Sequence, residues 1–217
     1  MQEDYYSRKE VSNSDLSWLK QQLWPRQVID PTQAYKFGSL IDAMITEPER
    51  VNYYKYTVGD VMYTKEQFDL AVMMKKAVYK DPQLMSLISV SNGQEEMSRD
   101  MEINYGGLFF FLSVRCKWDL WAGAWGWGGD IKSTTAKTQK EFEAAAIHFN
   151  YDRQRAWYMD IAQTDRDVLI GISKANQKIF KIFINKGDEF YSSGKEKYTE
   201  LAFRWWLLFG HNRPAAA

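Results

Sequence analysis

The sequence predicts a single α/β domain in which helices flank a mixed central sheet. The chain has 217 residues, a length typical of one domain. Hydrophobic residues make up 45% and aromatic residues 16% of the chain, which suits a sizeable core and excludes a disordered protein. Between residues 94 and 132, strand patterns follow one another as a meander, and helical patterns occupy the segments on either side. We therefore expect one domain over residues 1–217, with a loose N-terminus at 1–10 and a tail at 210–217.

The first two helices are predicted from caps and apolar spacing. Ser12 to Asp15 supplies N-cap residues before the apolar residues of segment 16–24, and the following proline ends that helix. Residues 31–44 form the next predicted helix, with Thr32 as its cap. Gly38 is costly in the middle of this helix. A glycine there either marks the close approach of another backbone or is simply tolerated.

A less regular segment separates these helices from the next pair. Residues 47–63 are polar and rich in tyrosine, and we expect a loop with a short strand at 53–57. Thr64 and Gln67 then form a capping-box pattern at the start of a helix that runs to residue 78. Residues 84–90 form a short helix or a turn.

The predicted sheet begins with a hairpin. Asn92-Gly93 is a turn signal, and residues 94–105 form the first strand. Gly106-Gly107 turns the chain into a second strand at 109–118, where aromatic, β-branched and polar residues partly alternate.

The last third of the chain adds helices and a second hairpin. An alanine-rich helix is predicted after Thr135, and a second one starts near Asn150. Residues 166–174 and 178–184 alternate as two strands of a hairpin, and residues 189–209 form a final amphipathic helix.

Two acids and a lysine stand on neighbouring predicted strands. Strand 109–118 delivers Asp119 at its C-terminal end, and after a turn the chain presents Asp130 and Lys132 at i and i+2, on one face of a short strand with Ile131 in the core. Carboxylates from adjacent strands can share a hard cation such as Mg2+, and a lysine beside a bound water can orient it and neutralise charge on a phosphodiester. A D-x-K pattern alone is weak evidence, because it occurs by chance in many surface strands.

Further motifs follow in a fixed order. Gln154 and Tyr158 form a Q-x-x-x-Y pattern on a predicted helix, where i and i+4 share one face. The order W-D, D-I-K-S-T, a helix, then N-Y-x-x-Q-x-x-x-Y resembles the PD-(D/E)XK nuclease superfamily, and within it the RecB/RecE-like exonucleases of bacteria and phages. The segment from Gly38 to Asp42 resembles the G-x-x-x-H pattern of that family, with aspartate in place of histidine. The resemblance covers roughly residues 12 to 209.

The resemblance implies roles for residues of the two central strands and of the helix that follows them. Asp119, Asp130 and the Ile131 carbonyl would hold one or two Mg2+ or Mn2+ ions, and Lys132 would position the attacking water. Gln154 and Tyr158 would contact DNA. Ser133 offers a hydroxyl either to a phosphate or to the cap of the following helix.

An acid on the first strand of the hairpin would complete the metal site in this family. Three glutamates of this strand are candidates for the position: Glu95, Glu96 and Glu102. We favour Glu96, because the start of this strand lies opposite the end of the next strand in an antiparallel hairpin. Asp42 is either a further oxygen ligand of the metal or an unrelated solvated acid.

The function implied by the resemblance is a Mg2+-dependent exonuclease of linear duplex DNA, with 5′ to 3′ polarity, in phage or recombination metabolism. A single-strand annealing protein is a candidate partner besides DNA. A structure-specific or restriction-like endonuclease would use the same catalytic residues, and a catalytically silent DNA-binding protein is the non-enzyme alternative. The tryptophan-rich loop at 121–127, the apolar end of the last helix and the ring-forming habit of similar phage exonucleases predict a homo-oligomer.

Composition excludes several other classes of protein and limits how DNA could be bound. Lys plus Arg and Asp plus Glu number 28 each, so contacts with DNA must be local rather than spread over a positive surface. A single cysteine excludes an intrachain disulfide and a four-cysteine iron–sulfur site. No apolar run reaches the ~20 residues of a membrane span, and the start of the chain lacks a signal-peptide core. We therefore expect a cytoplasmic protein without a membrane contact.

Overall fold

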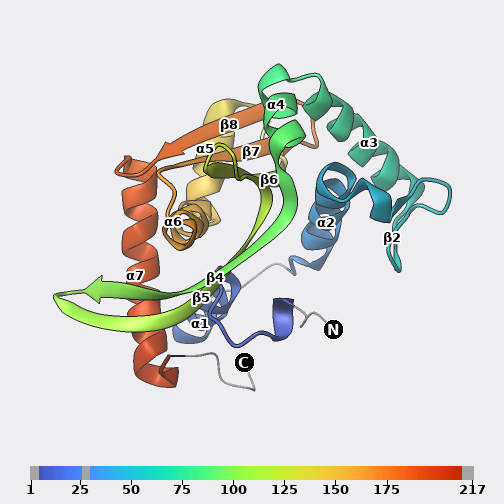
Figure 1. The fold of residues 1–217 in the computed structure, drawn as a ribbon. Coiled ribbons are helices and arrows are strands. Elements are labelled where there is room, and N and C mark those ends of the chain that lie inside the picture. Colours follow the sequence, from blue (N-terminus) through green and yellow to red (C-terminus); the bar gives the residue numbers. More distant parts are fainter. Residues whose placement is uncertain (1–4, 26–29, 212–217) are drawn as a thin grey trace.

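A computed structural model describes residues 5–25 and 30–211, and within them a five-stranded mixed sheet forms the centre of the molecule (Figure 1). The strands lie in the order of the sequence, and the β6–β7 pair is parallel while the other neighbours are antiparallel. The predicted mixed sheet flanked by helices is confirmed. The strands are β4 (Asn92–Tyr105), β5 (Leu108–Ala122), β6 (Trp127–Thr134), β7 (Arg166–Ser173) and β8 (Ile179–Asn185).

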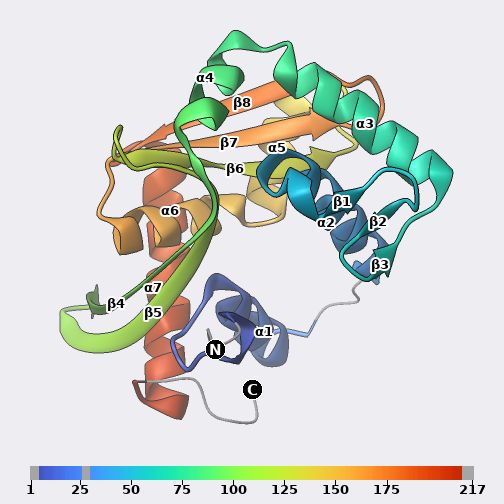
Figure 2. The same ribbon diagram turned by 45° about the vertical axis from the view of Figure 1, so that its right-hand side comes forward.

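Helices cover both faces of this sheet (Figure 2). One hydrophobic core lies between the sheet and α1, α5, α6 and α7, and a second core lies between the sheet and α2, α3 and α4. No helix within the described ranges is long and apolar enough to cross a bilayer. The α-helices are α1 (Asn13–Leu23), α2 (Thr32–Thr46), α3 (Lys65–Tyr79), α4 (Pro82–Val90), α5 (Gln139–His148), α6 (Tyr151–Ala162) and α7 (Glu189–Phe209), with short 3-10 helices η1 (Tyr5–Ser7) and η2 (Pro48–Arg50).

Local sequence signals account for most helix ends. Thr64 caps α3 in a capping box with Gln67, as the sequence predicts. Ser12 is the residue that caps α1 among the predicted N-cap residues 12–15, and it forms a capping box with Asp15. The prediction for Thr32 is wrong. This residue is the first of α2, with Pro31 at the N-cap position, because its amide and hydroxyl both donate to Asp30 in a local turn.

The tyrosine-rich segment also differs from its prediction. Residues 53–56 form a turn, because the Asn52 side chain accepts the amides of Tyr54 and Lys55. The strands of this region flank the turn instead. They form a small antiparallel sheet of two-residue strands, β1 (Val51–Asn52), β2 (Thr57–Val58) and β3 (Val61–Met62).

The β4–β5 hairpin is a long curved arm of the sheet (Figure 1). Asn92-Gly93, predicted as a turn, lies within β4, where Gly93 pairs with Leu120. A Cβ at Gly93 would lie 2.4 Å from the Thr46 carbonyl oxygen, so glycine is required for α2 to end against this strand. Glu95 pairs with Trp118, which leaves Gln94 opposite Asp119.

The outer edge of β5 carries the two ends of the described chain. Val11 donates its amide to the Ser113 carbonyl at 2.8 Å and accepts the Arg115 amide at 2.9 Å, and the His211 carbonyl accepts the Ser113 amide at 3.3 Å. Val11, which directly follows the expected loose N-terminus, therefore pairs with this strand. Most of the expected tail, residues 212–217, lies outside the described residues.

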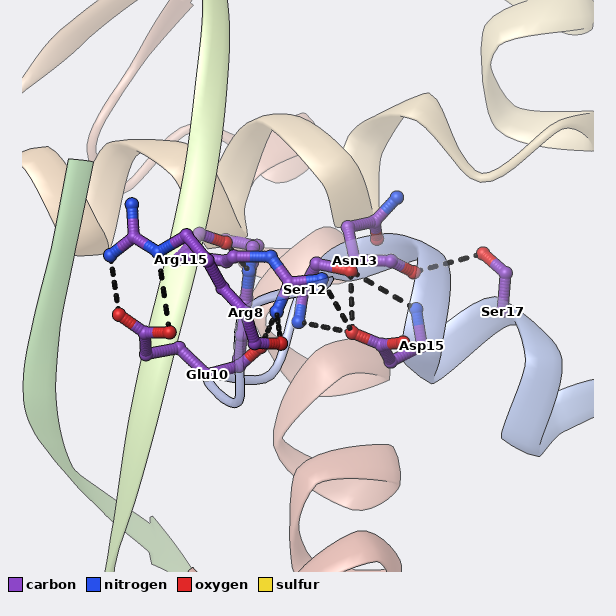
Figure 3. A network of polar contacts seen from close by, with 8 residues as sticks. Arg8, Glu10, Ser12, Asn13, Asp15, Ser17 and Arg115 are labelled. Carbon is purple, nitrogen blue, oxygen red and sulfur yellow. Dashed lines mark hydrogen bonds and ion pairs between the residues drawn. The ribbon is translucent and has the colours of Figure 1, made fainter. Parts of the chain in front are cut away.

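A polar network fixes this N-terminal segment to the sheet (Figure 3). The Arg115 guanidinium, 2% exposed, donates to the carbonyls of Arg8 and Glu10. It also forms an ion pair with Asp15 at 3.6 Å, and Asp15 accepts the Ser12 amide at 2.8 Å. One buried arginine on β5 thus links the N-terminal segment to the start of α1.

Candidate active site

Asp119 and Asp130 lie on the adjacent strands β5 and β6. Leu120 pairs with Gly129, and one further step of this register places Asp119 across from Asp130. The Asp119 carboxylate accepts the Ile131 amide at 2.7 Å, and Asp130 is 2% exposed. The pKa of Asp119 is raised to about 6, because burial and the charge of Asp130 outweigh the opposite effects of Lys132 and the Ile131 amide. Two carboxylates are therefore held together in a poorly solvated place.

Lys132 supplies the positive charge next to this pair. Its ammonium group forms an ion pair with Asp130, on the same face of β6, as the i, i+2 spacing predicts. Burial disfavours the ammonium form, but Asp130 and Asp119 outweigh it, so the pKa of Lys132 is raised. The Nζ atom also lies 5.3 Å from the centre of the Tyr151 ring. Lys132 is therefore charged and held at the carboxylates.

Asp42 brings a third carboxyl group from α2. Its Oδ1 atom is buried and makes no hydrogen bond. Burial raises the pKa of Asp42 well above its ordinary value, and electrostatic repulsion from Asp119 and Asp130 adds to this effect while Lys132 reduces it. An unpartnered buried carboxyl oxygen is costly unless a cation or a proton completes it. The structure thus turns Asp42 toward the two central aspartates.

The acids of β4 lie elsewhere. Glu96 pairs in register with Lys117, two residues from Asp119 or about 7 Å along the strand. Its carboxylate lies 3.6 Å from Arg8 and 3.7 Å from Lys117. Gln94, not Glu96, occupies the position across from Asp119.

The two remaining glutamates of β4 are also accounted for by the register. Glu95 pairs with Trp118 and so lies on the opposite face of the hairpin from Asp119. Glu102 pairs with Phe111, far along the arm. Glu96 stays a prediction as the third acid, although the register does not bring it to the pair.

The residues predicted to contact DNA lie on α6 and β6. Tyr158 is 8% exposed, with its ring 5.6 Å from that of Trp118. Gln154, one turn earlier, is half-buried, and so is Ser133 at the end of β6. Packing is therefore the role that the structure itself shows for Tyr158, and the three DNA contacts stay predictions.

Sequence reasoning missed a buried charge network behind Asp130. Arg155 of α6 is 0% exposed and donates to Asp130 at 2.8 Å and to Asp167 of β7 at 2.6 Å. Its guanidinium contacts the rings of both Trp118 and Tyr158, 4.6 and 4.7 Å from their centres. Arg155 holds one carboxylate oxygen of Asp130 and fixes the direction of the other. The only sequence signal was its place inside the Q-x-x-x-Y segment.

The donor set suits a hard divalent cation. Three carboxyl groups, from Asp42, Asp119 and Asp130, stand against the single charge of Lys132, which leaves two negative charges when all are ionised. All side-chain donors are oxygens, the ligands preferred by Mg2+ and Mn2+. Among the described residues no three acidic, histidine or cysteine side chains already stand at metal-ligand spacing, and Asp130 is paired with Lys132 and Arg155 instead. The unpartnered Asp42 oxygen is the observation that fits a cation.

A mixed sheet with an aspartate pair and a D-x-K lysine on two adjacent strands defines the class of PD-(D/E)XK nucleases. Within it, residues 10–215 match the model of the family described as a PDDEXK-like domain of unknown function (DUF3799), and the chain belongs to this family.

Solved structures agree with this fold. The chain is similar to a protein from Eubacterium rectale provisionally named an exonuclease, with a TM-score of 0.60, 17% identity, and coverage of 95% of this chain and 85% of that one. A phage-related exonuclease from Haemophilus somnus gives a TM-score of 0.44 at 9% identity, over 90% of this chain and 82% of that one. The search of curated proteins gave no match. The likeness to the Eubacterium rectale structure shows a shared fold.

Proposed function

We propose that the protein is a Mg2+-dependent exonuclease that hydrolyses phosphodiester bonds of linear duplex DNA. The observation that carries the proposal is the group formed by Lys132 with Asp42, Asp119 and Asp130, which come from α2 and from the adjacent strands β5 and β6. The family and its nuclease fold support metal-assisted phosphodiester chemistry as the reaction. Mn2+ is expected to replace Mg2+, because both accept oxygen ligands.

Each residue of the group has a distinct task in this proposal. Asp119 and Asp130, with Asp42 and the Ile131 carbonyl, would hold the cation, which supplies a water of lowered pKa and neutralises charge on the phosphate. Lys132 would leave its ion pair with Asp130 to hold the attacking water and the developing negative charge. Arg155, bound to Asp167, would keep Asp130 in place during this exchange.

The exonuclease and endonuclease alternatives differ in how they admit DNA. Equal amounts of linear duplex and covalently closed circular DNA are incubated with the protein and Mg2+, and a chelator serves as the control. We expect the linear form alone to be degraded, with nucleotides released from its ends, and no reaction in chelator. Cleavage of the closed circle at a comparable rate would show an endonuclease. Labels on the 5′ or the 3′ end test the proposed 5′ to 3′ polarity in the same assay.

The proposal also includes an oligomeric state, a cellular role and a protein partner. Exposed apolar residues support a homo-oligomer, because Trp125 is 46% exposed beside the stacked ring of Trp127, and Leu207 and Leu208 at the end of α7 are also exposed. Light scattering at micromolar concentration tests this, and a monomer would exclude it. A cytoplasmic role in phage or recombination DNA metabolism, with a single-strand annealing protein as partner, follows from the family resemblance and is tested by co-purification.

A further inference from the structure

Gly38 lies in the interior of α2, and the folded protein gives no packing reason for it. A glycine inside a helix is unfavourable relative to alanine. Where this protein needs glycine for packing, a Cβ would collide with backbone, as at Gly194, where it would lie 2.1 Å from the Asp152 carbonyl oxygen. A Cβ at Gly38 would have nothing within 4 Å. The close approach of another backbone, one of the two alternatives drawn from the sequence, is therefore absent from the described residues.

The open space beside Gly38 lies on the face of α2 that leads to the carboxylates. Gly38 precedes Asp42 by four residues and follows Tyr35 by three, so the three side-chain positions share one face of the helix. Asp42 points from this face toward Asp119 and Asp130. Tyr35 stands two turns before it and is 71% exposed. This face of α2 thus carries the exposed ring of Tyr35, then Gly38 without a side chain, and then Asp42 at the candidate metal site.

A second tyrosine borders the same approach from α6. Tyr151 is the first residue of that helix and is half-buried, and its ring lies 5.3 Å from the Lys132 ammonium. Burial raises the pKa of Tyr151, and its hydroxyl group also interacts electrostatically with Lys132, Asp130, Tyr35 and Asp42. Two aromatic rings from two helices therefore flank the way to the catalytic lysine.

We propose that this face is the subsite for the DNA strand next to the scissile phosphate, an inference that rests on the proposed nuclease function. Gly38 leaves room for the sugar–phosphate chain to pass directly over the helix backbone, a use for which only glycine is suitable. Tyr35 and Tyr151 offer rings on which the neighbouring bases stack, a contact that tolerates any base. The ligand is a single strand of DNA, as the opened end of a duplex would present it.

The test measures DNA binding separately from cleavage. A fluorescein-labelled single-stranded oligonucleotide is titrated with wild-type protein, Gly38→Ala and Gly38→Leu in Ca2+, and the anisotropy gives Kd. We expect Kd to rise several-fold for alanine and more than tenfold for leucine, while the melting temperature stays equal or increases. Ser39→Leu, on the next and exposed position of the same helix, is the matched control and should leave Kd unchanged.

Tyr35 gives an independent variant. Tyr35→Ala should raise Kd roughly five- to hundredfold, and Tyr35→Phe, which keeps the ring, should not. Wild-type Kd values for Gly38→Leu and Tyr35→Ala would overturn the inference. Failure of the proposed function gives a different result, because a protein that binds the oligonucleotide with this pattern but degrades no DNA in Mg2+ would retain the subsite and lose the nuclease assignment.

Discussion

Replacing Asp119 by asparagine should remove activity and at the same time stabilise the metal-free protein at neutral pH. Asparagine has the shape of aspartate, and its side-chain oxygen can still accept the Ile131 amide that Asp119 accepts at 2.7 Å. The substitution therefore removes one charge from the group formed with Asp130 and leaves the packing unchanged. In a site arranged to bind a cation, the buried carboxylates repel one another when the cation is absent. The variant measures how much this repulsion and burial lower the free energy of unfolding.

The magnitude follows from the pKa. The pKa of Asp119 is raised from 3.8 to about 6, chiefly by burial, which corresponds to about 3 kcal/mol as an upper figure. A carboxyl group with a higher pKa in the folded protein binds its proton more tightly there than in the unfolded chain. The contribution of Asp119 to the free energy of unfolding is therefore fully present below about pH 4 and is lost as the pH rises through 6. Asparagine cannot ionise, so the free energy of unfolding of the variant does not fall by this amount as the pH rises.

Urea unfolding in chelator at pH 4 and pH 8 tests the reasoning. The two proteins should be similarly stable at pH 4, and Asp119→Asn should be more stable at pH 8 by up to about 3 kcal/mol. Asp167, whose pKa burial also raises to about 6, is present in both and cancels in the comparison. Added Mg2+ should stabilise the wild type and not the variant. A variant that is less stable than the wild type at pH 8 would refute the description of the site as an uncompensated carboxylate group.

Three further substitutions test separate parts of the structure. Lys132→Ala should lower DNA cleavage by about 10²- to 10³-fold and leave Mn2+ affinity within a few-fold; near-normal rates would exclude the proposed mechanism. Arg155→Met leaves Asp130 and Asp167 without their buried partner and should lower the free energy of unfolding by about 3–5 kcal/mol, measured by urea titration, and an unchanged value would contradict the buried network. Gly194→Ala should destabilise by about 3 kcal/mol, because the new methyl group collides with a backbone carbonyl of α6, and a wild-type melting temperature would contradict this.

Local signals made much of the fold predictable. Three predictions follow from residues within a few turns of each other, and the structure confirms them: an N-cap within residues 12–15, the capping box at Thr64 and the 189–209 helix. The same holds for Asp130 and Lys132, whose common face depends only on the two-residue period of a strand. Such patterns need no knowledge of distant contacts.

Features that depend on tertiary contacts were not predictable. The position of Glu96 depends on the register of β4 against β5, and an offset of two residues moves it from Asp119 to Lys117. Arg155 and Asp167 have ordinary surface-residue types, and only the packing of α6 on the sheet shows that they are buried. The turn at Tyr54 required the side chain of Asn52 to compete with a strand ladder.

The attachment of both ends of the chain to Ser113 has a consequence for how the molecule can be rearranged. Val11 and His211 bond to the same residue of β5, the strand that carries Asp119, so the backbone is nearly a closed ring. A circular permutant that joins the two ends by a short linker and opens at the exposed Gly106-Gly107 tip keeps every contact of the sheet near the carboxylates. Val11 and His211 thus lie beside the strand that carries Asp119, whereas an insertion at the hairpin tip lies at the far end of the arm (Figure 1).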